Sequence, residues 1–501
     1  MRFHPLVALL LAACHPDLSQ PPDDTGRGDT GDTAPVIEAH LTAAPAFDPI
    51  LGGPLTVAVV TEGEPTVTVE VRDAGGTALT TVEGAWDGRD ASGAWAPVGT
   101  YTLHLTATRG PVTVEDERVV RVVRCGALEA WAEGDGGTSA TFVPLWWHQS
   151  GTLQGEEVAF TSAASLEDAH GAAVELPAPG EELGVFPDGG AVPVAFTWDS
   201  RPILTLRLGD ESVLGGSGLA GAGVRLEVEG WDPVAGTTDL DPVNPVVLQA
   251  PAPLGAGPGV LEETLQLRYL VDDEEGTTWE IGAQSLPVRW YLSLHAPAAD
   301  ASLPDGAPWV AALDPALRAI DGVEPTDQAV LSALVAWIYE DLGLSYDTTY
   351  GASYYTVYRN GWGPAVFDLT SFLHYGAGHT VNCSDCASIL TAWAAMLGIP
   401  LQYSIVLENF DLNYILAIGA SQFTHCPFGG WGCSFSYHAV TTPDTGSTIW
   451  DATLALDGDD DPSHSPCEQL MVQGLDGQEY LARLAMRGRV RYGYFGETYL
   501  Q

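Results

Sequence analysis

NCSDCASILTAWAAMLGIP, residues 382–400, is the stretch that predicts the central element of the C-terminal fold. Its apolar side chains recur at helical spacing around almost the whole circumference, which is typical of a buried helix. They are Ala387, Ile389, Leu390, Trp393, Ala394, Met396 and Leu397. Gly398 is a typical C-terminal cap, and Pro400 prevents continuation. The stretch therefore predicts a buried helix over residues 384–397, with Cys383 at its N-terminus.

Cys383 is a candidate nucleophile in this position. The unpaired N–H groups and the dipole at the start of a helix stabilise a thiolate, and an N–H there can also hold an oxyanion. Other uses of such a cysteine are an apolar core side chain, a disulfide or, with Cys386, a redox pair or half of a zinc site. No βαβ pattern precedes the pair, as a thioredoxin-like motif needs. The second pair, Cys426 and Cys433, encloses a Gly- and Pro-containing run that suits a zinc knuckle poorly.

His438 and Asp451 are candidates for the base and for the residue that orients it. Each lies in a short alternating run that predicts a strand, and residues 443–446, PDTG, predict the turn between the two runs. Pairing Thr442 with Ser447 across that turn places His438 directly opposite Asp451, with Cβ atoms about 4.5–5.5 Å apart. A carboxylate at that distance can orient an imidazole and select its tautomer.

These motifs resemble the transglutaminase-like superfamily over roughly residues 325–460. The matching residues are Cys383-x-Asp385-x-Ala387, then Gly398-Ile399-Pro400, His438-Ala439 and Asp451-Ala452-Thr453. The resemblance implies a papain-like α+β fold with a catalytic triad of Cys383, His438 and Asp451. Val440 stands where the family often has Trp, which predicts a cleft more open to water. Tyr346 and Trp362 are candidates for a second oxyanion donor.

Three classes of function are compatible with such a triad. The first is a thiol peptidase or amidase, in which water resolves a Cys383 thioester formed from a protein or peptide substrate. The second is an amine transferase that cross-links proteins through the same thioester. The third is a surface scaffold that has kept the fold without the chemistry. Bacterial members of the superfamily are more often proposed to be proteases, so the resemblance favours hydrolysis.

Composition narrows the partners and the architecture. The chain has 501 residues, which suggests about three domains. Its net charge is −47, with 66 acidic residues against 19 basic ones, and all of the basic residues are arginine. Nucleic-acid binding is not expected, because phosphate neutralisation needs clusters of basic side chains. The acidic surface favours solubility through self-repulsion.

The N-terminal residues indicate export and a lipid anchor. Residues 1–14 combine a short basic lead, an apolar core and LAAC, which resembles a bacterial lipoprotein signal with Cys14 as the lipidated residue. The alternative is an ordinary secretory signal. Residues 15–35 are rich in Pro, Asp, Thr and Gly and predict a disordered linker. The predicted location is the bacterial cell envelope, with the chain attached to the membrane through this anchor.

Two β-rich regions are predicted before the helical part. Residues 36–124 predict an all-β sandwich, and the motif Trp86-Asp87-Gly88-Arg89-Asp90 resembles the Ig-like domain of flagellar hook-capping proteins. Residues 125–300 predict a second β-rich domain whose role the sequence does not indicate. Residues 301–501 form the predicted transglutaminase-like domain. A helix is predicted in it that is capped at Thr326 or Asp327 and ends before Gly343.

The remaining cysteines and one acidic run complete the candidate sites. Four cysteines predict structural disulfides, in any of three pairings, while Cys125 has no evident partner. The four are Cys386, Cys426, Cys433 and Cys467. The run 457–461, DGDDD, could hold calcium through clustered oxygen ligands but lacks the spacing of a recognised calcium loop. A solvated acidic turn is the favoured interpretation, and no cofactor is expected.

Overall fold

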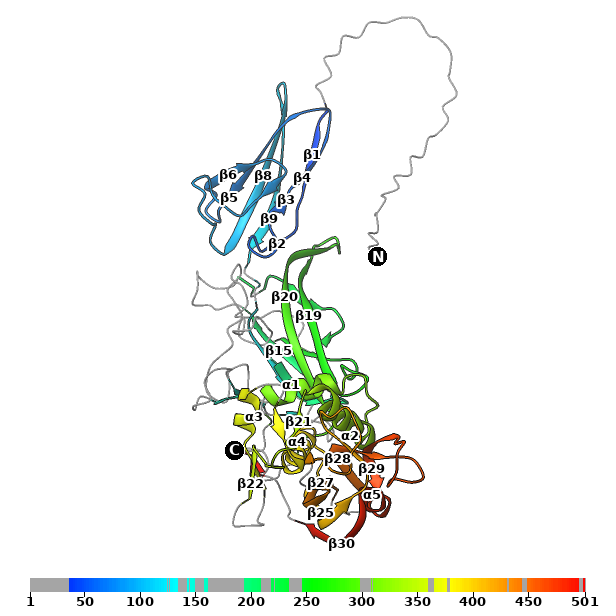
Figure 1. The fold of residues 1–501 in the computed structure, drawn as a ribbon. Coiled ribbons are helices and arrows are strands. Elements are labelled where there is room, and N and C mark those ends of the chain that lie inside the picture. Colours follow the sequence, from blue (N-terminus) through cyan, green and yellow to red (C-terminus); the bar gives the residue numbers. More distant parts are fainter. Residues whose placement is uncertain are drawn as a thin grey trace, which may run out of the picture.

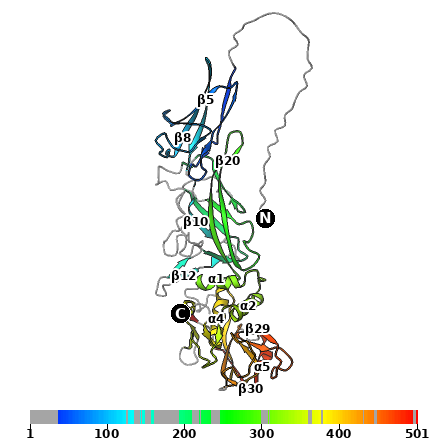
Figure 2. The same ribbon diagram turned by 45° about the horizontal axis from the view of Figure 1, so that its top comes forward.

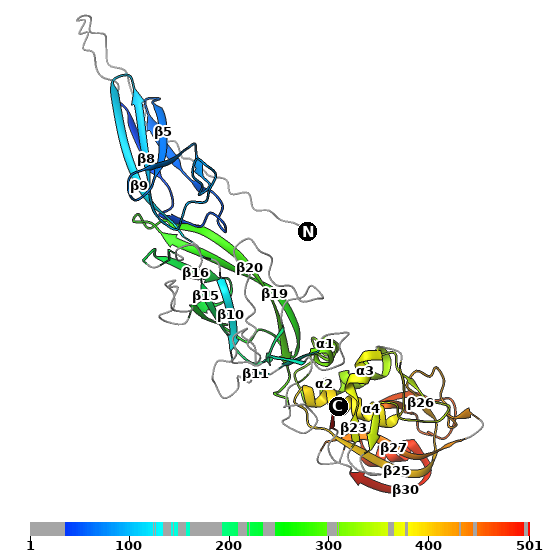
Figure 3. The ribbon, with the colours of Figure 1, turned by 90° about the vertical axis from the view of Figure 1, so that its left-hand side faces the viewer.

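The chain is a β-rich multidomain protein, seen here in a computed structural model (Figure 1). The structure describes residues 36–500, with gaps at 124, 126, 134–141, 144, 149–156, 161–192, 209–217, 220, 234–245, 298–307, 309, 359–364, 376–378, 430–431, 444–447 and 495–498. Three β-rich or mixed regions follow one another along an elongated molecule (Figure 3). None of the helices in these residues combines the length and the apolar character needed to cross a membrane.

The N-terminal region is built from one five-stranded sheet, ordered β2-β9-β8-β5-β6, and two strand pairs, β1-β4 and β3-β7. The strands are β1 Glu38–Thr42, β2 Ala46–Phe47, β3 Leu55–Thr56, β4 Ala58–Glu62, β5 Thr66–Arg72, β6 Ala78–Val82, β7 Ala85–Trp86, β8 Gly99–Arg109 and β9 Val112–Val122. Trp86 fills the core between Phe47 and Tyr101, each ring centroid 5.3 Å away. Its indole N–H donates to the Arg89 carbonyl and fixes the turn that follows.

The middle region contains a four-stranded sheet, β10-β15-β18-β17, and a five-stranded sheet, β11-β14-β20-β19-β16, besides the pair β12-β13. The strands are β10 Ala127–Glu133, β11 Phe142–Val143, β12 Leu145–His148, β13 Glu157–Phe160, β14 Pro193–Thr197, β15 Ile203–Leu208, β16 Val224–Val228, β17 Asp232–Pro233, β18 Val246–Gln249, β19 Gly259–Asp272 and β20 Thr278–Ser293. The long β19–β20 hairpin runs from the N-terminal region to helix α1, Val310–Ala319 (Figure 2).

Apolar packing continues across both predicted domain boundaries. Asp48 of the first region donates its N–H to the Ile281 carbonyl, and its carboxylate accepts the N–H of Cys125 at 2.7 Å. Cys125 is buried in the same core. At the other end, Tyr291 and Leu294 of the middle region join the C-terminal core. The neighbouring regions therefore share cores, while the domain boundaries themselves stay a prediction.

The C-terminal region packs helices against a sheet with the order β26-β28-β27-β25-β30, and β29 also pairs with β28. The helices are α1 Val310–Ala319, α2 Asp327–Ala336, the π-helical turn η2 Trp337–Asp341, α3 Leu369–Tyr375, α4 Cys383–Met396 and α5 Gly477–Leu484. The strands are β21 Ser345–Tyr346, β22 Thr356–Tyr358, β23 Ala365–Phe367, β24 Thr380–Val381, β25 Gln402–Leu412, β26 Ile415–Ala417, β27 Ser434–Thr442, β28 Thr448–Asp457, β29 Gln469–Asp476, β30 Ala485–Tyr494 and β31 Tyr499–Leu500.

Helix α4 lies in the centre of this region, and the prediction of a buried helix is confirmed. Every residue from Cys383 to Met396 is buried. The Trp393 indole donates to the Ala312 carbonyl of α1 at 2.7 Å and meets the Trp337 ring edge-on at 5.5 Å. The predicted helix before Gly343 is also confirmed, since Thr326 caps α2 and the π-helical turn continues to Asp341.

Gly398 ends α4 in a Schellman motif. Its φ is +79°, its N–H donates to the Ala395 carbonyl, and the N–H of Ile399 donates to the Ala394 carbonyl. A Cβ at this position would collide with the Ala296 carbonyl oxygen. Glycine is therefore required both by the left-handed backbone and by the close approach of the preceding segment.

Replacing Gly398 with Ala should lower the free energy of unfolding by about 3 kcal/mol, because backbone strain and a steric clash act together. Gly322→Ala is the matched control, since Gly322 has a φ of +74° but open space around its Cβ position. It should cost only about 1 kcal/mol. Urea denaturation of both variants measures the difference, and equal losses would contradict a steric role for Gly398.

Candidate active site

The N-terminus of α4 is held by a reciprocal cap. The Asn382 side chain accepts the N–H groups of Ser384 and Asp385, and the Asp385 carboxylate accepts the N–H of Asn382. The Asn382 amide also donates to the Gly351 carbonyl at 3.0 Å. Cys383 is the first residue of the helix, and its own N–H is not used by this cap. The Asn-x-x-Asp spacing was a signal for the cap that the sequence interpretation did not use.

Asp385 ties a neighbouring segment to the start of α4. Its carboxylate accepts the Ser353 hydroxyl and the N–H groups of Tyr354, Tyr355 and Thr356, at 2.7 to 3.0 Å. Burial raises the pKa of Asp385, although these hydrogen bonds favour the charged form. The carboxylate thus fixes residues 353–356 beside Cys383.

His438 and Asp451 form a buried pair. Nε2 of His438 lies 2.8 Å from Oδ2 of Asp451, and the two side chains are 0% and 1% exposed. Oδ1 of Asp451 accepts the N–H of Thr453 at 2.8 Å, and Oδ2 also accepts the Tyr480 hydroxyl at 2.8 Å. The carboxylate is therefore oriented from three directions. Tyr480 was missed at the sequence level, where only an amphipathic pattern marks its helix.

The predicted register between the strands of His438 and Asp451 is wrong, but the predicted contact between the two side chains is present. Thr441 pairs with Trp450, so the hairpin is shifted by two residues from the pairing that sets His438 directly opposite Asp451. Because side chains alternate with a period of two, a shift of two leaves both residues on their original face. They meet diagonally, where β28 leaves β27 and pairs with β26 at Ala417↔Leu454. The turn residues 444–447 lie outside the described residues.

The surroundings of His438 favour its imidazolium form. Burial by itself lowers the pKa of His438, but the charge and hydrogen bond of Asp451, with a smaller contribution from Cys383, raise it to about 10. Nδ1 is buried and has no well-formed hydrogen bond. With Nε2 taken by Asp451, Nδ1 is the nitrogen left to act on the Cys383 thiol. The structure thus brings Cys383, His438 and Asp451 together.

Cys383 lines a cavity of about 440 Å³. Apart from Asp411 and Gly351, the other lining residues have aromatic or neutral polar side chains. They are Tyr346, Tyr350, Asn382, Asn409, Phe428, Ser434, Phe435, Ser436 and Tyr437. Phe435 stacks on Tyr346 at 6.1 Å and lies 5.7 Å from the His438 ring. Burial raises the pKa of Tyr346 well above its usual value, so its hydroxyl keeps its proton. Aromatic rings and polar groups therefore share the wall of this cavity.

Val440 does not line this cavity, contrary to the prediction of a cleft opened by its small side chain. It is 1% exposed and belongs to the core around α4. The Val440 side chain packs in that core and does not form part of the cavity wall. Trp362, the other predicted oxyanion donor besides Tyr346, lies outside the described residues, as does Cys14.

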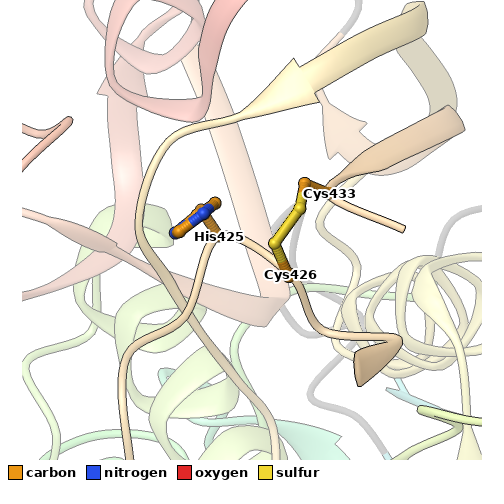
Figure 4. A group of neighbouring side chains, drawn as sticks. All are labelled: His425, Cys426 and Cys433. Atoms are coloured by element: carbon orange, nitrogen blue, oxygen red, sulfur yellow. A yellow bond between two sulfur atoms is a disulfide. The ribbon is translucent and has the colours of Figure 1, made fainter. Parts of the chain in front are cut away.

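The four predicted disulfide cysteines form one bridge, Cys426–Cys433 (Figure 4). Cys386 and Cys467 are free thiols, so the prediction is wrong for them. Cys386 faces the core from α4, because the helix that presents Cys383 turns this side chain inward. The His425 ring lies beside the bridge, and the three potential ligand atoms fall within 4.8 Å of one another. Both sulfur atoms are bonded, so no thiolate is available there for a metal.

The acidic run at the end of β28 is organised by its own backbone and by one arginine. Asp457 accepts the N–H of Asp459, and Asp459 accepts that of Asp461. The Arg483 guanidinium donates to the carbonyls of Asp457 and Asp459 at 2.9 and 3.0 Å. This arrangement is a turn held by a cationic side chain.

Comparisons of the chain with known proteins do not identify a family for it. No family model and no curated protein matches the chain. The solved structure of the Clostridium thermocellum CbhA fibronectin(III)-like modules is similar to 51% of this chain and 94% of its own, at 12% identity and a TM-score of 0.17. That score is too low to support any argument about fold or activity.

The His438 ring should stay protonated at pH 8 and titrate near pH 10. Because the folded-state pKa is raised, the stability from this group is fully present below about pH 6.5 and is lost as the pH rises through about 10. NMR titration of the imidazole nitrogens measures the pH of this transition. Asp451→Asn should lower that pH, and a wild-type transition near pH 6.5 would contradict the ion pair.

The Cys426–Cys433 bridge should stabilise the loop that carries Phe428 into the cavity wall. Replacing both cysteines with Ser should lower the free energy of unfolding by about 2–3 kcal/mol, as expected for a short loop. Denaturant unfolding under non-reducing conditions gives the value. Cys467→Ser serves as the control and should leave stability unchanged, since Cys467 is a free thiol.

Proposed function

We propose that this protein is a cysteine hydrolase that cleaves amide bonds in a protein or peptide through a Cys383 thioester. One observation carries the proposal: a buried His438–Asp451 pair, 2.8 Å apart, lies beside a thiol at a helix N-terminus that lines a cavity. A histidine whose pKa is about 10 favours a thiolate–imidazolium pair at neutral pH. That pair is the resting form of an activated thiol nucleophile.

The reaction proceeds in two displacements. The Cys383 thiolate attacks the carbonyl carbon, the C–N bond breaks, and the His438 imidazolium gives its proton to the departing amine. Neutral His438 then removes a proton from water, whose oxygen attacks the thioester, and Cys383 leaves as a thiolate with the acid as product. Asp451 holds the ring through Nε2, so that Nδ1 faces the reacting atoms in both steps.

Two donors are suited to the oxyanion of both tetrahedral intermediates. The first is the Cys383 N–H, which the Asn382 cap leaves out. The second is the Tyr346 hydroxyl, from a buried ring of the cavity wall that retains its proton. Preorganised donors of this kind favour the transition state over the planar carbonyl.

The proposed class is the transglutaminase-like superfamily, with a papain-like α+β domain at the C-terminus. The support is the order of the motifs from Cys383 to Asp451, together with a helix that presents the thiol to a sheet carrying the other two residues. The Ig-like assignment of residues 36–124 is proposed in the same way. Lipidation at Cys14 would attach the chain to the cell envelope, with the β-rich regions between membrane and active site.

Amine transfer is the second candidate, and the cavity wall favours it. A thioester survives long enough for an amine only where water is kept away. The aromatic side chains of Tyr346, Phe428 and Phe435 line the cavity beside Cys383 and would shield part of a thioester there. The same intermediate then forms a new amide with a primary amine in place of water.

Incubation with glutamine- and amide-containing peptides, in the presence of excess primary amine, should give cleavage or deamidation products. Mass spectrometry of the products distinguishes the two routes. Cys383→Ala should reduce turnover to background while the protein remains folded, since a small buried side chain replaces another. Faster amine incorporation than hydrolysis would make the protein a transferase.

A folded Cys383→Ala variant with wild-type turnover would refute both candidates. Ser388→Ala is the matched control on the same helix, because it also changes one small buried side chain of α4. Its turnover should equal that of the wild type.

A further inference from the structure

Tyr480 is a buried side chain of the site that the proposed reaction does not use directly. It lies on α5, whose N-terminus is capped by the Asp476 carboxylate. The ring is fully buried, and its hydroxyl donates to Oδ2 of Asp451 at 2.8 Å. The same oxygen accepts the His438 ring, so two donors meet on one carboxylate oxygen.

Arg483 holds α5 against the strand that carries Asp451. One turn beyond Tyr480, its guanidinium donates to the carbonyls of Asp457 and Asp459, at the end of β28. It also pairs with Glu479 on the same helix at 3.1 Å. Helix α5 is therefore attached to β28 at two points, by Tyr480 at Asp451 and by Arg483 at Asp457 and Asp459.

We propose that Tyr480 is a positioning residue that keeps the Asp451 carboxylate aimed at Nε2 of His438. A carboxylate removed from water is costly to ionise unless donors replace the lost hydration. Tyr480 is one of three donors to this carboxylate, and the only hydroxyl among them. Removing the hydroxyl makes the ionised carboxylate less stable, and so weakens the support for the imidazolium. The inference rests on the proposed function of the triad.

Other titratable groups lie around Asp451, and their charge states determine how a change in the pH dependence of the site is interpreted. They are Cys383 and Cys386 from α4, Tyr339 from η2 and Tyr346 from β21. Burial raises the pKa of Cys386, Tyr339 and Tyr346, so these three stay neutral across the acidic range. A change in that range is therefore not caused by Cys386, Tyr339 or Tyr346.

The test is the pH profile of Cys383 alkylation by iodoacetamide in the full chain, followed residue by residue by mass spectrometry. In the wild type, alkylation should be fast at neutral pH and fall at acidic pH, where the charged pair is lost. Tyr480→Phe keeps the ring and removes the hydroxyl. In this variant the fall in alkylation should occur at a pH about one unit higher than in the wild type. Thermal unfolding of the variant is recorded alongside.

Tyr291→Phe is the matched control, because the Tyr291 hydroxyl also donates to a carboxylate, Asp314, at 2.7 Å in the middle of the molecule. It removes the same kind of bond and should leave the alkylation profile unchanged. If Tyr480→Phe loses only thermal stability and its profile overlays the wild type, Tyr480 is structural and the inference fails. If Cys383 of the wild type alkylates no faster than a free thiol, the proposed function itself fails.

Discussion

The fold around the candidate site depends on burying the N-terminus of α4. A helix enclosed on every side cannot leave its first N–H groups to water, so they need partners within the protein. The Asn382 side chain accepts the N–H groups of Ser384 and Asp385, and the N–H of Cys383 is left beside the cavity. Asp385 in turn binds the N–H groups of residues 354–356. The same hydrogen bonds hold the Cys383 side chain at the cavity. One cluster of side chains therefore both caps the N-terminus of α4 and places the Cys383 thiol at the cavity.

The buried His438–Asp451 pair imposes a second constraint. A charge removed from water must be paired and hydrogen-bonded, and this carboxylate has donors from β27, β28 and α5. These elements are separate segments between residues 434 and 484 of the chain. The sheet and α5 are therefore as much a part of the site as the helix that carries Cys383.

Much of this site could be predicted from local patterns, and the errors have definite physical causes. The helix of Cys383 and its cap at Gly398 follow from residues close in sequence. The pairing of His438 with Asp451 was predicted on the right face but in the wrong register, because alternation along a strand sets the face whereas turn geometry sets the register of a hairpin. Disulfides were predicted from an oxidising compartment, from the number of cysteines and from the Gly-rich segment around Cys426 and Cys433, where a bridge does form. Cys386 instead points into the core from the same helix as Cys383.

The sequence by itself determined the β-rich character, the buried helix and the residue types of the candidate triad, because spacing and composition act over short distances. Only the tertiary structure decided that Tyr480 meets Asp451, that Val440 lies in the core, and that aromatic side chains wall the cavity. These outcomes depend on how distant segments pack together. Packing of that kind leaves no periodic signal in the chain, since each contact joins residues whose local patterns are independent.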